Sequence, residues 1–152
     1  MTREIKFRCW IKKEKRMDNV DFINFAAQFT GKWECKEPDD LFDVATKRGR
    51  LFNLEDVELM QYTGLKDKNG RDIYEGDVVK GVFEFEYEID EDLWKTTRES
   101  IVGEVVFQFG CFGVLFEDGC FKPLYEAVLS KTEVIGNVFE NPELLEEVNN
   151  EK

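Results

Sequence analysis

The sequence predicts a mainly β protein of the α+β class, in which the C-terminal half forms a small SH3-like antiparallel barrel. Apolar and charged residues alternate through residues 79–89, which is the period of a strand with one charged face. Several short apolar runs follow, and glycine-containing turns separate them. Aromatic residues make up 14% of the chain, and such large rings are typical of β packing or of an interface. We therefore expect a smaller α+β subdomain in residues 1–58 and a β-barrel domain with a short C-terminal helix in residues 59–152.

The N-terminal subdomain is expected to open with a strand. Residues 5–10 alternate with a period of two, and one face of this strand is basic. Residues 12–16, KKEKR, predict a polar turn. Apolar residues within 21–35 follow helical spacing but also fit a strand, so this segment is either a helix or a strand. Pro38 and its acidic neighbours predict a loop at residues 36–40.

Residues 59–80, LMQYTGLKDKNGRDIYEGDVVK, place two turn signals between short apolar runs. Asn69 and Gly70 tolerate the positive φ that a tight turn requires, so residues 68–70 predict such a turn. Residues 75–77 break the chain again just before an apolar pair. The turn-forming residues of this segment therefore have an architectural role that needs no ligand. We assign that role to Tyr62, Gly64, Asn69, Gly70, Tyr74, Gly76 and Asp77.

The rest of the C-terminal half is predicted to consist of strands joined by turns, followed by a helix. Residues 90–100 are expected to form a polar excursion. Residues 101–109 and 111–116 predict two strands joined at a glycine, and residues 133–139 predict a last strand. Residues 141–143, Asn-Pro-Glu, begin the helix, with Asn as the N-cap and Pro at the first helical position.

Three blocks of the chain resemble the YopX family of phage and prophage proteins. These are the segment 59–80, the basic and aromatic opening REIKFRCWIKKEKRM at 3–17, and the lead-in FNLEDVELM at 52–60. Cys9 stands where a small residue is usual in the family, and Ile11 where an acidic residue is usual. The resemblance implies phage ancestry and a folded protein that does not look catalytic. The function of the family itself is uncharacterised.

Charge is distributed unevenly along the chain, whose formal net charge is −12. Residues 1–16 carry seven Lys or Arg against two Glu, whereas residues 84–92 carry six acids and no base. Residues 140–152 add five Glu against one Lys. The net negative charge disfavours a general grip on nucleic-acid phosphates. A basic end and acidic edges could bind one another head to tail, could meet a partner protein of opposite charge, or could be ordinary solvated faces.

The residue types and motifs that most often carry catalysis or hold a metal are missing from the sequence. There is no histidine, no GxxxxGK[ST] loop and no GxSxG motif. Glu84, Glu86 and Glu88 alternate along one strand about 7 Å apart, too far apart to ligate one ion without another strand. The cysteines are expected to be buried reduced thiols, and Cys111 and Cys120 are the one plausible disulfide pair. We predict no enzyme activity, no metal and no cofactor.

The expected function is that of a non-catalytic accessory protein of a phage or prophage, which assembles with itself and binds a host or phage protein. An alternative is a nucleic-acid-associated phage protein that uses the basic N-terminal strand. No window reaches the ~18 apolar residues of a membrane span, and no apolar core follows the basic N-terminus as in a signal peptide. We therefore expect the protein in the cytoplasm of a bacterial host, away from membranes. The candidate partner surface comprises Lys12, Lys13, Lys15, Arg16, Glu84, Glu86, Glu88 and Trp94.

Overall fold

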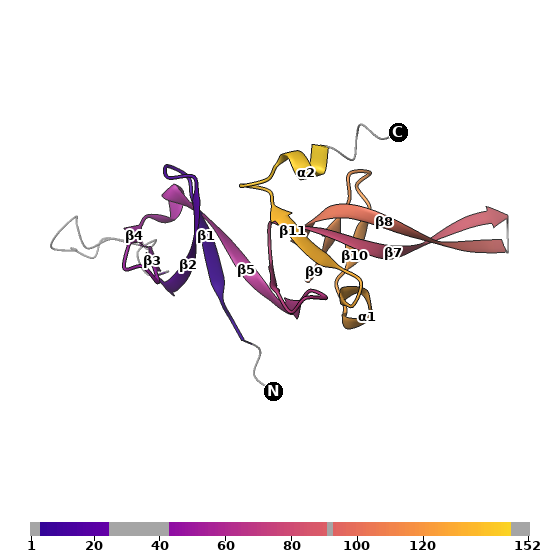
Figure 1. Cartoon of the computed structure of the whole chain (residues 1–152), viewed down its shortest axis with the longest axis horizontal. Helices are drawn as coiled ribbons and strands as arrows, with labels where there is room; N and C mark the ends of the chain where they lie inside the picture. The colour runs from indigo at the N-terminus through magenta and orange to yellow at the C-terminus, as the bar shows by residue number, and fades with distance from the viewer. Residues whose placement is uncertain (1–3, 25–42, 91–92, 147–152) are drawn as a thin grey trace. The chain divides into compact units, whose positions relative to one another are not determined.

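The computed structural model describes residues 4–24, 43–90 and 93–146. They form a mostly β structure with two antiparallel sheets and short helices, which confirms the predicted β character (Figure 1). The chain divides into two compact units, Met1–Tyr62 and Thr63–Lys152. No helix within the described ranges is long and apolar enough to cross a membrane.

The first sheet has six strands in the order β4-β3-β2-β1-β5-β6. β1 and β2 form a hairpin in which Cys9 lies opposite Asp18, and β5 pairs with the other edge of β1. The boundary predicted after residue 58 falls inside β5, which continues past Tyr62. The bounds are β1 Phe7–Ile11, β2 Arg16–Ile23, β3 Val44–Thr46, β4 Leu51–Phe52, η3 Leu54–Asp56, β5 Val57–Lys66 and β6 Asp72–Tyr74.

The core of the first unit forms around β1. Cys9 and Ile11 are buried against Val44 and Val57, so the alternation that predicts the first strand is confirmed. Arg8, on the face that the sequence predicts to be basic, is buried as well. That face is therefore less exposed to a partner than its charge suggests.

Part of the N-terminal prediction lies outside the described residues. Within the segment 21–35, residues 21–23 belong to β2, whereas residues 25–35 lie outside the described part. The loop predicted at 36–40 also lies outside it. The helix-or-strand alternative is therefore decided as strand only as far as Ile23.

The second sheet has five strands in the order β10-β9-β8-β7-β11. In the described part of the chain, the edge strands β10 and β11 do not pair with each other, so this sheet does not close into a barrel. The predicted SH3-like barrel is therefore not confirmed. β10 is only three residues long and ends at Pro123, which has no N–H for a strand ladder. The bounds are β7 Asp77–Asp90, β8 Leu93–Gln108, β9 Cys111–Leu115, β10 Phe121–Pro123, α1 Glu126–Leu129, β11 Glu133–Asn137 and α2 Glu143–Glu146.

One face of the second sheet forms the larger core. Val79, Phe83 and Phe85 share the face that alternation assigns to them, and all three are buried. The rings of Phe83 and Phe85 pack edge-on against Phe116, at 4.9 and 5.8 Å between centroids. Gly81 leaves the space that this core needs, since a Cβ there would lie 2.7 Å from the Thr132 hydroxyl. The remaining members of the cluster are Ile73, Val105, Val114, Leu129 and Val134.

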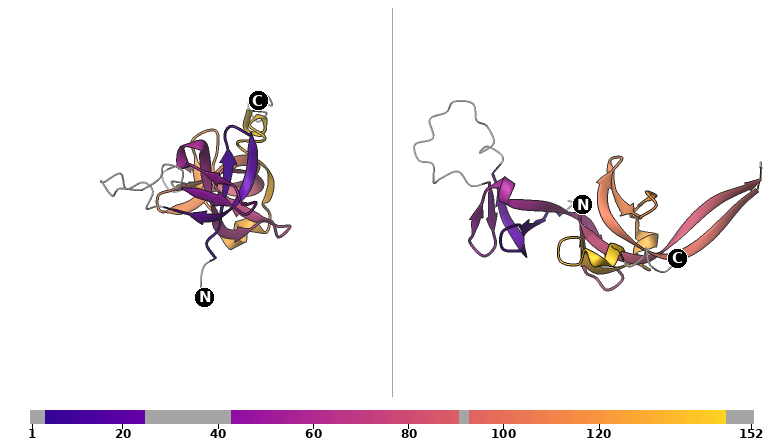
Figure 2. Two further views of the ribbon diagram at one scale, coloured as in Figure 1. Left: turned by 90° about the vertical axis from the view of Figure 1, so that its left-hand side faces the viewer. Right: turned by 90° about the horizontal axis from the view of Figure 1, so that it is seen from above.

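β7 and β8 extend beyond the rest of their sheet as a two-stranded arm (Figures 1 and 2). β11 pairs only with residues 77–80 of β7, and β9 only with residues 104–108 of β8. Residues 84–90 and 93–100 therefore pair only with each other, and we call them the arm. The prediction of a polar excursion at 90–100 is wrong, because β8 begins at Leu93.

Candidate partner-binding surface

The arm places the three predicted acids and Trp94 on one face. Residues directly opposite each other in an antiparallel pair lie on the same side of the sheet. Glu84 lies opposite Arg98, and Glu88 lies opposite Trp94. Glu86 lies between Glu84 and Glu88 on the same face of the strand. Glu84 also accepts a hydrogen bond of 2.7 Å from the Arg98 Nε. The acidic candidates therefore form one continuous stripe that ends at an aromatic ring.

The end of the arm exposes large apolar side chains. Ile89 is 59% exposed, Leu93 57% and Trp94 61%. Residues 84–100 also carry seven acidic side chains against two basic ones. An apolar tip with an acidic stripe is the combination of anchor and charged rim that protein interfaces use.

A second exposed aromatic side chain lies at the turn between β8 and β9. Phe109 is 88% exposed and has a φ of 51°, which is rare for a bulky residue. Its ring packs edge-on against Phe121, with 5.5 Å between centroids. Phe121 in turn lies over Gly113, where a Cβ would come within 2.2 Å of the ring. The sequence does not predict this exposed ring, because its pattern places residue 109 at the end of a strand that runs from 101 to 109.

The basic candidates lie in and beside the turn between β1 and β2. Lys12 pairs with Glu58 at 2.9 Å and donates to the Glu55 carbonyl, so its ammonium is already engaged. Lys13 and Lys15 are exposed in the turn, and Lys15 has a φ of 49°. These two lysines are therefore the candidates that present charge to solvent most freely.

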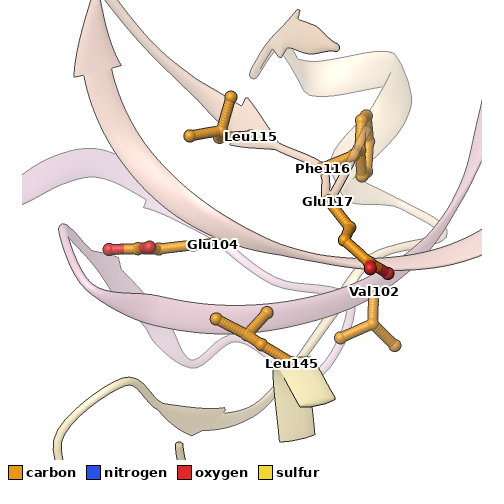
Figure 3. A pocket seen from close by; sticks show the side chains of 6 residues that line it. All are labelled: Val102, Glu104, Leu115, Phe116, Glu117 and Leu145. Carbon is orange, nitrogen blue, oxygen red and sulfur yellow. The ribbon is translucent and has the colours of Figure 1, made fainter. Parts of the chain in front are cut away.

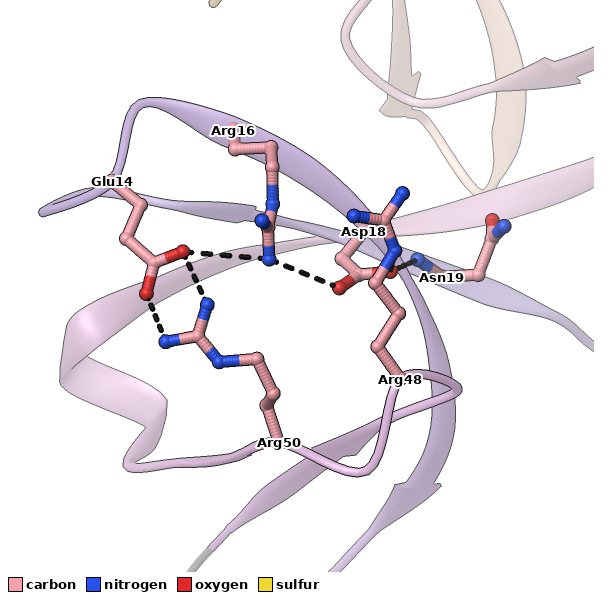
Figure 4. A network of polar contacts seen from close by, with 6 residues as sticks. All are labelled: Glu14, Arg16, Asp18, Asn19, Arg48 and Arg50. Carbon is pink, nitrogen blue, oxygen red and sulfur yellow. Dashed lines mark hydrogen bonds and ion pairs between the residues drawn. The ribbon is translucent and has the colours of Figure 1, made fainter.

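Arg16 belongs to a network of polar contacts in the first unit (Figure 4). Its guanidinium lies 3.4 Å from Glu14 and 3.6 Å from the buried carboxylate of Asp18. Arg50 donates two hydrogen bonds to Glu14, which hold the pKa of Glu14 below its usual value. Arg48 lies 3.6 Å from Asp18 on its other side. Acids thus neutralise much of this basic cluster within the unit itself.

The same unit contains a thiol with little reactivity. Burial, reinforced by the charge of Asp18, raises the pKa of Cys9 to about 11. The thiol therefore stays protonated at neutral pH and is a poor nucleophile. Cys111 and Cys120 are partly buried free thiols, so the pair considered as a disulfide is not bonded.

Asp67 connects the turn at residues 68–70 to β11 of the second sheet. Its Oδ1 accepts hydrogen bonds from the amides of Asn69 at 2.8 Å and Arg71 at 2.9 Å, and its Oδ2 accepts one of 3.0 Å from Val134. Burial alone would raise the pKa of Asp67, but these three N–H donors outweigh it and hold the pKa below its usual value. The sequence identifies the neighbouring Asn69 and Gly70 as turn residues, but it does not predict this role for the Asp67 carboxylate.

The residues with a predicted architectural role form turns or make buried contacts. Asp77 is fully buried and accepts a hydrogen bond of 2.8 Å from the Tyr74 amide. Tyr62 is buried, and the Lys6 ammonium lies 4.5 Å from the centre of its ring. Positive φ angles occur at the three glycines named, which are Gly64 at 86°, Gly70 at 81° and Gly76 at 74°.

A pocket of about 210 Å³ lies on the second unit (Figure 3). Val102 and Glu104 of β8 contribute to its wall, and burial raises the pKa of Glu104. The sequence does not predict this pocket, although Glu104 is a lone acid within the apolar run IVGEVVF. Within the described residues, no group of three or more His, Cys, Asp or Glu side chains is placed to hold a metal ion. The lining is completed by Leu115, Phe116, Glu117 and Leu145.

Comparison with known proteins decides the family. The family model described as YopX protein matches residues 6–146. The chain belongs to the YopX family. The crystal structure of protein EF1440 from Enterococcus faecalis is 28% identical, with a TM-score of 0.55 over 95% of this chain and 99% of that one.

A second solved structure resembles the chain at the level of the fold. The crystal structure of protein yopX from Bacillus subtilis is 23% identical, with a TM-score of 0.51 over 92% of this chain and 95% of that one. A search of curated proteins finds no match. Family membership and fold are therefore established, and the function has to be argued from the surfaces described above.

Proposed function

We propose that this YopX-family chain is a non-catalytic protein-binding module that assembles with itself. In this proposal it is a phage or prophage accessory protein that acts in the cytoplasm of a bacterial host. The observation that carries the proposal is the arm, which has an acidic stripe on one face and exposes three large apolar side chains at its tip.

The arm contributes little to the folded core. Phe83 and Phe85 are buried at its base, but the side chains toward its tip are exposed. A two-stranded ribbon is marginally stable by itself in water. Ile89, Leu93 and Trp94 are exposed at the end of this ribbon, so a partner that covered them would bury apolar surface that the chain itself leaves in water.

The chemistry of the arm favours a basic partner. Residues 63–152 hold 21 acidic and nine basic side chains, whereas residues 1–62 hold 12 of each. The net charge of −12 thus belongs entirely to residues 63–152. Complementary charge favours binding of the arm to a basic surface, including the exposed Lys13 and Lys15 of a second copy.

Sedimentation of charge-reversal variants tests self-assembly. The protein is expected to associate more strongly at low salt than at high salt, because screening weakens contacts between exposed charges. Changing Glu84, Glu86 and Glu88 together to Lys should abolish the association. A matched control variant carries the same change in net charge away from the arm, at Glu55, Glu143 and Glu146.

Three results would contradict the proposed self-assembly. The unchanged protein could remain a monomer at every concentration. The arm variant could associate as strongly as the unchanged protein. The matched control could lose the association to the same extent, which would reduce the effect to net charge alone.

The alternative role, binding of nucleic acid by the basic N-terminal strand, has less support. Arg8 is buried, and Lys12 and Arg16 already lie beside acidic side chains. A steep loss of DNA or RNA affinity with rising salt would favour the alternative, whereas no binding at low salt would remove it.

A further inference from the structure

Most residues that line the pocket on the second unit belong to strands or to a helix. Val102 and Glu104 belong to β8, Leu115 to β9, and Leu145 to α2 (Figure 3). α2 is seated closely on β11, because a Cβ at Gly136 would lie 2.7 Å from a methyl group of the neighbouring Leu144. Two strands and a helix therefore supply four of the six lining residues, and Phe116 and Glu117 of the turn after β9 supply the other two.

The negative charge of Glu104 has no compensating partner in this pocket. Its carboxyl group has no hydrogen bond or ion pair within the part of the chain that the structure describes. Val102, Leu115 and Leu145 make its surroundings largely apolar, and burial raises its pKa. Glu104 is half-buried, so its carboxylate is partly removed from water and would be stabilised by a cation or a hydrogen-bond donor.

The lining selects one class of ligand. Anions are disfavoured because two carboxylates, Glu104 and Glu117, line the pocket. Calcium needs six to eight oxygen ligands, and the other four lining residues are apolar. A neutral hydrocarbon would fill the pocket but would leave Glu104 uncompensated. A cation on an apolar stem satisfies both the walls and the acid.

We propose that this pocket binds an alkylammonium group. The ammonium pairs with the carboxylate of Glu104, and the methylene stem packs against Val102, Leu115 and Leu145. Glu117 adds a second negative charge to the site. The same chemistry is present in a free aliphatic amine and in a lysine side chain of a partner protein. This site is separate from the arm, and the proposal for it does not depend on the binding role proposed for the arm.

A titration with n-butylammonium chloride, followed by methyl NMR, tests the site. The methyl signals of Val102, Leu115 and Leu145 should shift in a saturable way. 1-Butanol and butyrate, which have similar stems without a positive charge, should bind at least roughly tenfold more weakly, the effect expected for loss of one charge-assisted hydrogen bond.

Two substitutions assign the effect to the pocket. Glu104→Gln keeps the size of the side chain and should weaken butylammonium binding by roughly tenfold. Glu86→Gln makes the same charge change on the arm and should leave the affinity unchanged. The amide spectrum of each variant verifies that the fold is intact.

The source of the ammonium is distinguished by a lysine residue blocked at its amino and carboxyl ends. If the blocked lysine binds as tightly as butylammonium, the ligand is a lysine of a protein; if only the free amine binds, it is a small amine. The proposal is overturned if butylammonium produces no saturable shifts. It is equally overturned if butanol binds as well as butylammonium, or if Glu104→Gln has no effect.

Discussion

Asp67 joins two parts of the second unit that are far apart in the sequence. Its two carboxylate oxygens accept three backbone hydrogen bonds, from the amides of Asn69 and Arg71 and from that of Val134 in β11. A carboxylate can accept at both oxygens, whereas an amide side chain must present an N–H at one of them. This residue is therefore a sensitive test of the architectural role of the turn.

Asp67→Asn should destabilise the second unit by about 1–3 kcal/mol, because one buried N–H would face another donor. Hydrogen exchange at the Val134 amide, which should accelerate, measures the change. Asp118→Asn is the matched control, because Asp118 caps a single amide in an exposed turn. Equal effects of the two substitutions would contradict the role given to Asp67.

The pH dependence of the same residue follows from its lowered pKa. The folded state holds the Asp67 proton less tightly than the unfolded state. Its contribution to stability is therefore present above the ordinary aspartate pKa and is lost as the pH falls through the lower pKa of the folded protein. Asp67→Asn should remove this part of the acid-induced loss, which acid unfolding curves would reveal.

Cys9 offers a chemical test at the residue scale. Its thiol is buried and its pKa is raised to about 11, whereas Cys111 and Cys120 are partly exposed. Iodoacetamide at mildly alkaline pH should modify Cys111 and Cys120 well before Cys9, as measured by mass spectrometry of peptides. Rapid modification of Cys9 in the folded protein would show that its surroundings open readily.

At the scale of elements, the arm is predicted to be dispensable for folding. Phe85 lies directly opposite Thr97, so residues 86–96 can be replaced by Asn-Gly, a dipeptide suited to a two-residue hairpin. The shortened protein should keep a cooperative unfolding transition and the amide spectrum of the core, because Phe83 and Phe85 remain. Loss of cooperative unfolding would show that the arm stabilises the unit.

The elements predictable from sequence are those with one buried face. β7 was predicted because Val79, Phe83 and Phe85 alternate with charged residues along a strand that covers the core. The outer half of β8 was missed because much of its length is exposed, which leaves no apolar alternation to detect. The pocket was missed because it requires α2 to pack beside β8 and β9, which no local pattern encodes.

The site residues likewise divide into those whose role the local sequence predicts and those whose role it does not. Gly70 and Gly76 were assigned to turns because local backbone chemistry requires their positive φ angles, and the structure has those angles. Arg8 was placed on a basic face without any local sign that it is buried. The partners of Asp67 include Val134, 67 positions away, so only the folded chain identifies its role.

At the scale of the whole molecule, charge is segregated between the two units. Residues 1–62 are neutral as a whole, and residues 63–152 carry the entire net charge of −12. The acidic side chains of the arm add to this field at the place where apolar side chains are exposed. We therefore expect this arrangement to favour encounters with basic proteins over encounters with nucleic acid.

Site-specific photo-cross-linking at position 94 in the bacterial host tests the proposed role of the arm most directly. A photoreactive aromatic residue in place of Trp94 should give cross-links to protein, either to a second copy or to another chain. These cross-links should disappear when Glu84, Glu86 and Glu88 are changed to Lys. The same probe at Tyr125, which is similarly exposed, should give far fewer. No cross-link from position 94, or equal cross-linking from both positions, would contradict the proposal that the arm binds protein.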